Sequence, residues 1–214
     1  MLHKVYMFSE LAPSDTDKLT AHCQTRSYPA NAILINEGDQ TDSLYVIVEG
    51  EVKVFANDNH GKEVILNILG PGEYFGEIAL VDDQPRSASV MTISPTKVMI
   101  ISKGNFKRCL EENPDMSFNL IRALTKQVRA LTDSVKNLAL MDVYGRVAHT
   151  LLDLADEIDG KQVIEQKLTH QDIANMVGAS REMVSRILKD LSTGGYITVD
   201  KKHITINEKL PAAW

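Results

Sequence analysis

The fold is decided by the stretch Phe75-Gly76-Glu77-Ile78-Ala79-Leu80-Val81-Asp82-Asp83-Gln84-Pro85-Arg86-Ser87-Ala88, which joins a glycine turn, a carboxylate and a guanidinium on one short apolar segment. Gly76 permits close approach of the backbone to another group. The N–H groups of Ile78 and Ala79 begin a predicted short helix, and the first N–H groups of a helix favour an anion. The stretch therefore predicts a small anion-binding turn.

The two charged side chains of this stretch differ in what they recognise. Arg86 is able to hold a phosphate through two parallel hydrogen bonds, whereas Glu77 accepts from hydroxyl or amine groups. A ligand with a phosphate at one end and a sugar hydroxyl at the other satisfies both. The alternative is a glycine turn beside a surface Glu–Arg pair.

In register, these residues closely resemble the phosphate-binding cassette of cyclic-nucleotide-binding domains. The resemblance implies that Arg86 and Ser87 hold the cyclic phosphate and that Glu77 binds the ribose 2′-hydroxyl. It also implies backbone contacts from Gly76 and Ala79, with Ile78 between them in the same site.

Composition and charge limit the function classes. The chain has 214 residues, 43% of them apolar and 24% charged, as expected for one or two globular domains. It has no apolar run of membrane-spanning length and no signal-peptide pattern at its N-terminus, so we expect a cytoplasmic protein without a membrane partner. The isolated Cys23 and Cys109 and the scattered histidines predict no metal site. With a formal charge of −6, any DNA contact has to come from a local patch.

Short apolar runs separated by turn residues fill the region from about Ala32 to Ser102 and predict an all-β unit. The runs are Ile33–Ile35, Leu44–Val48, Val52–Phe55, Val64–Leu66 and Val98–Ile101. Glycine or Asn/Asp residues between them supply the positive φ of tight turns. We expect a β-roll with helical ends, including a short leading helix before Pro29.

A long helix is predicted to begin near Pro114 and to carry an apolar seam with spacings of three and four residues. The seam has β-branched residues at each a position and leucine at each d position, a choice that favours two parallel helices. Its members are Ile121, Leu124, Val128, Leu131, Val135 and Leu138. We expect a dimer helix; the alternative is an amphipathic helix packed on its own domain.

Beyond Asp142 the pattern predicts a helix-turn-helix. Thr169 is the expected N-cap of the first helix, Gly178 supplies the turn, and Ser180 caps the second helix, which runs through Leu191. The second helix has an apolar face and an opposite polar face, which we expect to contact DNA. The alternative is a charged surface helix in an unrelated bundle.

Arginine matches the acceptors of guanine and glutamate the amino group of cytosine. We therefore expect Arg181 and Arg186 to bind guanines and Glu182 a cytosine. The apolar runs at 197–199 and 204–206 predict a β-hairpin wing whose Lys201 contacts phosphate. The remaining expected DNA contacts are Ser185, Lys189, Thr169 and Ser180.

Taken together, residues 5 to 207 resemble the bacterial transcription regulators of the cyclic-AMP receptor protein/fumarate-nitrate regulator (CRP/FNR) family. The segment Arg181-Glu182-x-x-x-Arg186 is similar to the receptor-protein branch, which implies an inverted-repeat operator with TGTGA-like half-sites, a homodimer and contact with RNA polymerase. The iron–sulfur branch needs a cluster of N-terminal cysteines that this sequence lacks, and no residue stands out as a haem ligand. We expect neither cofactor.

One departure from the family bears on the ligand. Relatives that respond to cyclic AMP carry two adjacent hydroxyl residues on the dimer helix, and here the matching pair is Leu131-Thr132. The resemblance implies that Thr132 binds the adenine across the dimer, while Leu131 has no hydroxyl. Cyclic AMP (cAMP) is the first expectation and cyclic GMP (cGMP) the second.

The expected fold is α+β, with a cyclic-nucleotide-binding β-roll over residues 1–112, a dimerisation helix and hinge over 113–139, and a winged helix-turn-helix over 140–214. We expect a ligand-gated transcription regulator and not an enzyme, because a nucleotide phosphodiesterase needs clustered His and Asp ligands that the sequence lacks. A regulatory subunit that binds nucleotide and inhibits a partner enzyme, and a family member that binds DNA without ligand, remain alternatives.

Overall fold

The computed structural model describes residues 2, 5–9, 11–200 and 203–211, and the chain divides into two compact units, Met1–Arg129 and Ala130–Trp214. The division falls within one long helix, α4, which spans Pro114–Leu140. The separate dimerisation segment over 113–139 stays a prediction. No helix among the described residues has both the length and the apolar character needed to cross a membrane.

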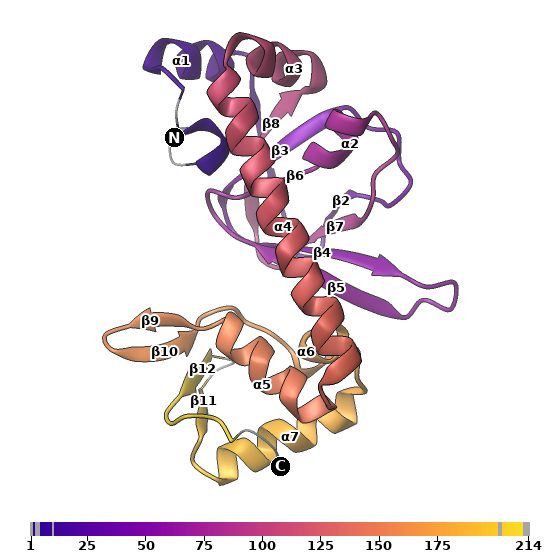
Figure 1. The fold of residues 1–214 in the computed structure, drawn as a ribbon, viewed down its shortest axis with the longest axis vertical. Coiled ribbons are helices and arrows are strands. Elements are labelled where there is room, and N and C mark those ends of the chain that lie inside the picture. Colours follow the sequence, from indigo (N-terminus) through magenta and orange to yellow (C-terminus); the bar gives the residue numbers. More distant parts are fainter. Residues whose placement is uncertain (1, 3–4, 10, 201–202, 212–214) are drawn as a thin grey trace. The chain divides into compact units, whose positions relative to one another are not determined.

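Two antiparallel four-stranded sheets form the described β-structure of the first unit (Figure 1). Their strand orders are β1-β8-β3-β6 and β2-β7-β4-β5. The strands are β1 Gln24–Tyr28, β2 Ile33–Ile35, β3 Ser43–Glu49, β4 Val52–Asn57, β5 Glu63–Leu69, β6 Tyr74–Phe75, β7 Ser89–Thr92 and β8 Thr96–Ser102. Alternate side chains of both sheets meet in one buried cluster because successive residues of a strand point to opposite faces. Its members are Ile35, Ile47, Val52, Leu69, Phe75, Val90 and Val98.

Helices cover the other face of the β1-β8-β3-β6 sheet. There Leu44 and Val46 of β3 and Ile101 of β8 pack in a second buried cluster with Phe106 and Met116 of the covering helices. The helices of this unit are η2 Tyr6–Phe8, α1 Pro13–Ala21, α2 Glu77–Asp82, α3 Lys103–Glu112 and the first part of α4. The second cluster therefore fixes where α3 and the start of α4 lie against the sheet.

The second unit is a three-helix bundle with a small antiparallel sheet of order β11-β12-β10-β9. Its elements after α4 are α5 Val143–Asp153, β9 Asp156–Ile158, β10 Lys161–Ile164, α6 His170–Val177, α7 Arg181–Thr193, β11 Ile197–Asp200 and β12 His203–Ile206. Helix α7 turns one apolar face inward, with Val184, Ile187, Leu188 and Leu191 all buried.

The predicted α+β architecture is confirmed, as are the β-rich first part, the long helix from Pro114 and the helix-turn-helix. The five predicted strand runs lie in β2, β3, β4, β5 and β8. The strands β1, β6, β7, β9 and β10 were not predicted. The leading helix is α1, but strand β1 lies between it and Pro29. The wing hairpin is present as β11 and β12, while its Lys201 lies outside the described residues.

Candidate ligand site and nucleic-acid interface

The turn before α2 can be made only by glycine. Gly76 is the N-cap of α2 with φ of 87°, in the left-handed region that other residues rarely adopt. A Cβ at this position would lie 2.5 Å from Arg86 Nη1 and 3.0 Å from the carbonyl oxygen of Ser43. The missing side chain thus makes room for the guanidinium directly beside the start of the helix.

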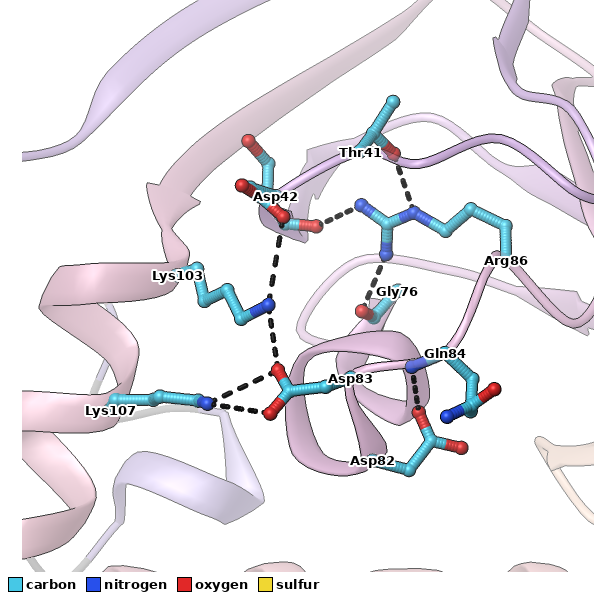
Figure 2. Close-up of polar contacts among 10 residues, drawn as sticks. Thr41, Asp42, Gly76, Asp82, Asp83, Gln84, Arg86, Lys103 and Lys107 are labelled. Carbon is cyan, nitrogen blue, oxygen red and sulfur yellow. Dashed lines mark hydrogen bonds and ion pairs between the residues drawn. The ribbon is translucent and has the colours of Figure 1, made fainter.

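The Arg86 side chain is buried, with 3% of its surface exposed, and three neutral oxygens hold it (Figure 2). Its Nε donates to Thr41 Oγ1, its Nη1 to the Gly76 carbonyl and its Nη2 to the Ser43 carbonyl, each at a distance of 2.6 Å. Among the described residues no carboxylate forms an ion pair with it. Burial lowers the pKa of Arg86, yet a guanidinium stays protonated at neutral pH. The guanidinium therefore stays charged, and no carboxylate among the described residues lies within ion-pair distance of it.

Two N–H groups of Arg86 remain for an anion. A guanidinium has five N–H donors, and the three bonds to described residues use one on each nitrogen. One N–H is then left on Nη1 and one on Nη2, and each is able to donate to an anion.

Glu77, the first residue of α2, is also buried, with 7% exposed. Burial raises the pKa of its carboxyl, and the nearby Arg86 partly offsets this effect. A carboxyl group in such a place gains from any hydroxyl that a ligand donates to it, because that bond stabilises the charged form. Glu77 thus suits a sugar hydroxyl better than a second phosphate.

Backbone hydrogen bonds tie the cassette to the loop before β3. The N–H of Arg86 donates to the Asp39 carbonyl over 3.0 Å, and the N–H of Gly38 donates to the Arg86 carbonyl over 2.9 Å. This loop and the first residue of β3 bring in Thr41 and Ser43, two partners of Arg86 that were not predicted. The sequence signal for these two residues is weak: they are polar and stand between a Gly-Asp turn and an apolar strand.

The other predicted ligand residues differ in exposure. Ala79 is buried and Ile78 half-buried on α2, while Ser87 is exposed directly after Arg86. Thr132 is exposed on α4, in the part that belongs to the second unit. Its predicted contact with a base stays a prediction.

The apolar seam of α4 is largely uncovered. Most of its predicted members have about half or more of their surface exposed, namely Ile121, Val128, Leu131, Val135 and Leu138. Leu124 differs: it is half-buried and packs on the second buried cluster of the first unit, between the β1-β8-β3-β6 sheet and its helices. An apolar row that its own chain leaves open is the face expected to meet another helix.

The helix-turn-helix is closed by caps at each turn. Thr169 is the predicted N-cap, and it forms a capping box with Asp172: the Thr169 side chain accepts from the Asp172 N–H, and the Asp172 carboxylate accepts from the Thr169 N–H. Gly178 ends α6 with φ of 64°, and the Ser180 hydroxyl accepts from the N–H of Met183 at the start of α7. These caps fix where each helix begins by satisfying its first free N–H groups.

Helix α7 presents its charged face outward. The side chains of Arg181, Glu182, Arg186 and Lys189 are all exposed. Hydrogen bonds from its own backbone N–H and from the Ser180 hydroxyl lower the pKa of Glu182, so it is an ionised acceptor at neutral pH.

Ser185 is the exception on this face. It is half-buried, and its hydroxyl oxygen lies 2.8 Å from Nδ1 of His170, the first residue of α6. His170 was not among the predicted DNA contacts. Its place next to the cap Thr169 is the only sequence signal that could have identified it.

Comparison with known families matches both units. Residues 25–113 match the family model of the cyclic nucleotide-binding domain, and residues 145–209 match that of the Crp-like helix-turn-helix domain. The first match contains Gly76, Glu77 and Arg86, and the second contains α6 and α7.

Whole-chain relatives agree with these matches. The cAMP-activated global transcriptional regulator CRP of Pasteurella multocida is 38% identical over 193 residues, which cover 87% of this chain and 91% of that protein. The cAMP-activated global transcriptional regulator Vfr of Pseudomonas aeruginosa is 36% identical over 200 residues, covering 89% and 92%.

Solved structures have a similar fold. The c-di-GMP-responsive global regulator CLP of Xanthomonas campestris has a TM-score of 0.78 and 25% identity, covering 92% of this chain and all of that one. The catabolite activator protein of Thermus thermophilus has a TM-score of 0.57 and 28% identity, covering 95% and 94%.

Proposed function

Because the chain belongs to the CRP/FNR family of cyclic-nucleotide-binding, DNA-binding transcription regulators, we propose that it is a homodimer that binds its operator in response to cAMP. Members of this family are transcription regulators and not enzymes. The operator is an inverted repeat with TGTGA-like half-sites, one for each α7, and the bound dimer contacts RNA polymerase.

One observation carries the proposal: the buried Arg86 guanidinium has only neutral oxygens as partners among the described residues. A buried charge is costly unless it is paired, so the site favours an anionic ligand. A cyclic phosphate carries one negative charge and matches one guanidinium. The free N–H groups on Nη1 and Nη2 bind its oxygens, and Glu77 accepts from the ribose 2′-hydroxyl.

The choice of cAMP rests on two further points. Two relatives that are 36–38% identical are named as cAMP-activated. Thr132 supplies a hydroxyl on α4 that is able to accept from the adenine amino group, although Leu131 beside it offers none. We keep cGMP as the second ligand. The CLP structure is named for c-di-GMP, so a cyclic dinucleotide belongs in the test.

The chemistry of α7 supports the operator. Arg181 and Arg186 are suited to the O6 and N7 acceptors of guanine, and the ionised Glu182 to the cytosine amino group. Lys189, Lys201 and the caps Thr169 and Ser180 are proposed phosphate contacts. In a homodimer two copies of α7 enter successive major grooves ~34 Å apart.

The regulation is a shift between two states of the dimer. Ligand bound at Arg86 and Glu77 favours the state in which both α7 helices match the operator, with residues 137–142 as the hinge. The ligand shifts this equilibrium only by its difference in affinity for the two states. A coupling of about 2–3 kcal/mol changes DNA affinity about 30- to 150-fold.

The test is fluorescence anisotropy with a labelled duplex that carries two TGTGA half-sites, titrated with the protein alone and with cAMP, cGMP or c-di-GMP. We expect cAMP to tighten binding about 30-fold or more at fixed salt, and a duplex with one scrambled half-site to bind weakly. Equal DNA affinity with and without each nucleotide would contradict ligand gating. Failure to bind the duplex in all conditions would leave the regulatory-subunit alternative in its place.

A further inference from the structure

An ion-pair network lies at the end of α2 and includes none of the residues proposed to contact the ligand. Asp83 follows α2 with φ of 58°, and its carboxylate lies between two lysines of α3 (Figure 2). Lys103 Nζ lies 2.7 Å from its Oδ1, and Lys107 Nζ lies 3.2 Å from both of its oxygens. The two lysines are four residues apart and so share one face of α3.

Lys103 also contacts the loop before β3, which holds Arg86 from the other side. The N–H of Lys103 donates to the Asp42 carbonyl over 2.9 Å, and its Nζ lies 3.7 Å from Asp42 Oδ1. Asp42 stands between Thr41 and Ser43, the residues that accept hydrogen bonds from Arg86. The start of α3 therefore contacts both segments that position the Arg86 side chain.

Helix α2 needs such support. It has six residues, too few to be stable without contacts to the rest of the protein. Asp83 ends the helix in the left-handed conformation, with φ of 58°, which aspartate and asparagine adopt more readily than most residues. Hydrogen bonds from Lys103, which has the larger effect, and from Lys107 lower the pKa of Asp83, so its carboxylate is ionised at neutral pH.

We propose that Asp83, with Lys103 and Lys107, is the positioning residue of the phosphate cassette: it holds the end of α2 on α3 so that Glu77 and Arg86 bind one ligand together. The proposal rests on the proposed function and names a residue that touches neither phosphate nor sugar. The network thereby joins α2 to α3, and only Asn113 separates α3 from α4. By linkage, the factor by which bound ligand stabilises this network equals the factor by which the intact network strengthens ligand binding.

The sign of one substitution separates positioning from simple electrostatics. Removing a carboxylate near an anion site reduces repulsion and should strengthen binding of a phosphate. Positioning predicts the opposite. Asp83→Asn is the suitable variant, because asparagine keeps the size of the side chain and tolerates the left-handed conformation.

The experiment is calorimetric titration of the full chain with cAMP at low and at high salt. We expect Asp83→Asn to bind about three- to tenfold more weakly than the wild type at low salt, with a smaller ratio at high salt, because salt screens exposed ion pairs. Asp82→Asn is the matched control: it removes the neighbouring carboxylate, which accepts a hydrogen bond from the Gln84 N–H over 3.0 Å. We expect its affinity to equal or exceed that of the wild type.

A second variant and a second readout keep the test decisive. Lys107→Gln should lose less cAMP affinity than Asp83→Asn. The double variant should lose less affinity than the product of the two single fold-losses, because the two side chains share one interaction. The unfolding temperature is measured without nucleotide. If Asp83→Asn lowers this temperature but binds cAMP like the wild type, or if Asp82→Asn loses as much affinity, the inference is wrong. A wild type that binds no cyclic nucleotide overturns the proposed function, and the inference with it.

Discussion

Replacing Val128 by aspartate tests the dimer helix, because this side chain lies in the exposed seam of α4 with 62% of its surface uncovered. Full burial of a valine side chain stabilises by about 1.5–3 kcal/mol, so covering the exposed part gives about 1–2 kcal/mol per copy. A symmetric interface contains the residue twice, which makes about 2–4 kcal/mol per dimer. Val128→Asp removes at least this amount and places two carboxylates opposite each other. We expect the dimer dissociation constant to rise at least about 30- to 700-fold.

The assay is sedimentation equilibrium over a range of protein concentrations, with circular dichroism to confirm that the helix content is kept. Ala130→Asp is the matched control, because it adds the same charge at an exposed position of α4 outside the seam. We expect the control to dimerise like the wild type. An unchanged dissociation constant in Val128→Asp would show that the seam of α4 is not the dimer interface. An equal loss in Ala130→Asp would show that the added charge, and not the lost burial of the seam, weakens the dimer.

Three further predictions concern the two sites. Burial raises the pKa of Glu77 above its usual 4.5, so the folded state binds more protons and the free energy of unfolding falls as pH rises above about 4.5. Urea unfolding at about pH 5 and about pH 8 should show a smaller fall in Glu77→Gln, and an equal fall would count against the buried carboxyl. Glu182→Ala should relax base choice at one position of each half-site by about 1–3 kcal/mol; recovery of an unchanged motif by selection from random DNA would contradict the assignment. Gly178→Ala should cost about 1–2 kcal/mol of stability through its φ of 64° alone, since the nearest atom to a new Cβ is 3.5 Å away; an unchanged urea midpoint would show that the turn relaxes.

The sequence predicts the strands that carry a continuous apolar signal. Runs such as Leu44–Val48 and Val98–Ile101 lie in β3 and β8, in the middle of a sheet with both faces covered. The missed strand β1 lies at the edge of the same sheet, and four of its five residues are exposed. An edge strand with polar side chains has no apolar pattern, so the sequence alone reads it as a loop.

Short strands were missed for a related reason. The strand β6 has two residues and β9 has three, fewer than a period-two pattern needs to be visible. They form because neighbouring strands offer hydrogen-bonding partners, β3 to the first and β10 to the second. Tertiary pairing, and not local preference, makes these strands.

For the ligand site, the sequence identifies the residues that are close in the chain. Gly76, Glu77 and Arg86 fall within eleven positions, and their spacing is enough to predict one cassette. Thr41 and Ser43 act on Arg86 from more than forty positions away, and their role depends on how the loop before β3 folds back. A single sequence has no signal for such a contact.

The same limit applies to the surroundings of the two sites. The bonds of Asp83 to Lys103 and Lys107 join residues twenty or more positions apart. On α4, heptad spacing assigns Leu124 to the seam, while the structure packs it on the core of the first unit. Spacing gives the direction of a side chain on a helix, but the neighbours of that helix decide which face is covered.

Calorimetric titration of Arg86→Lys with cAMP is the sharpest test of whether the buried Arg86 guanidinium binds the phosphate of a cyclic nucleotide. Lysine keeps the charge but not the paired N–H donors, so at least one charge-assisted hydrogen bond is lost, at about 1.5–3 kcal/mol. Arg26→Lys is the matched control, because Arg26 is exposed on β1 and its side chain bonds Gln24. We expect one site per chain in the wild type and in Arg26→Lys, and an affinity about 10- to 150-fold weaker in Arg86→Lys. Equal affinity in Arg86→Lys and the wild type would contradict this role of Arg86.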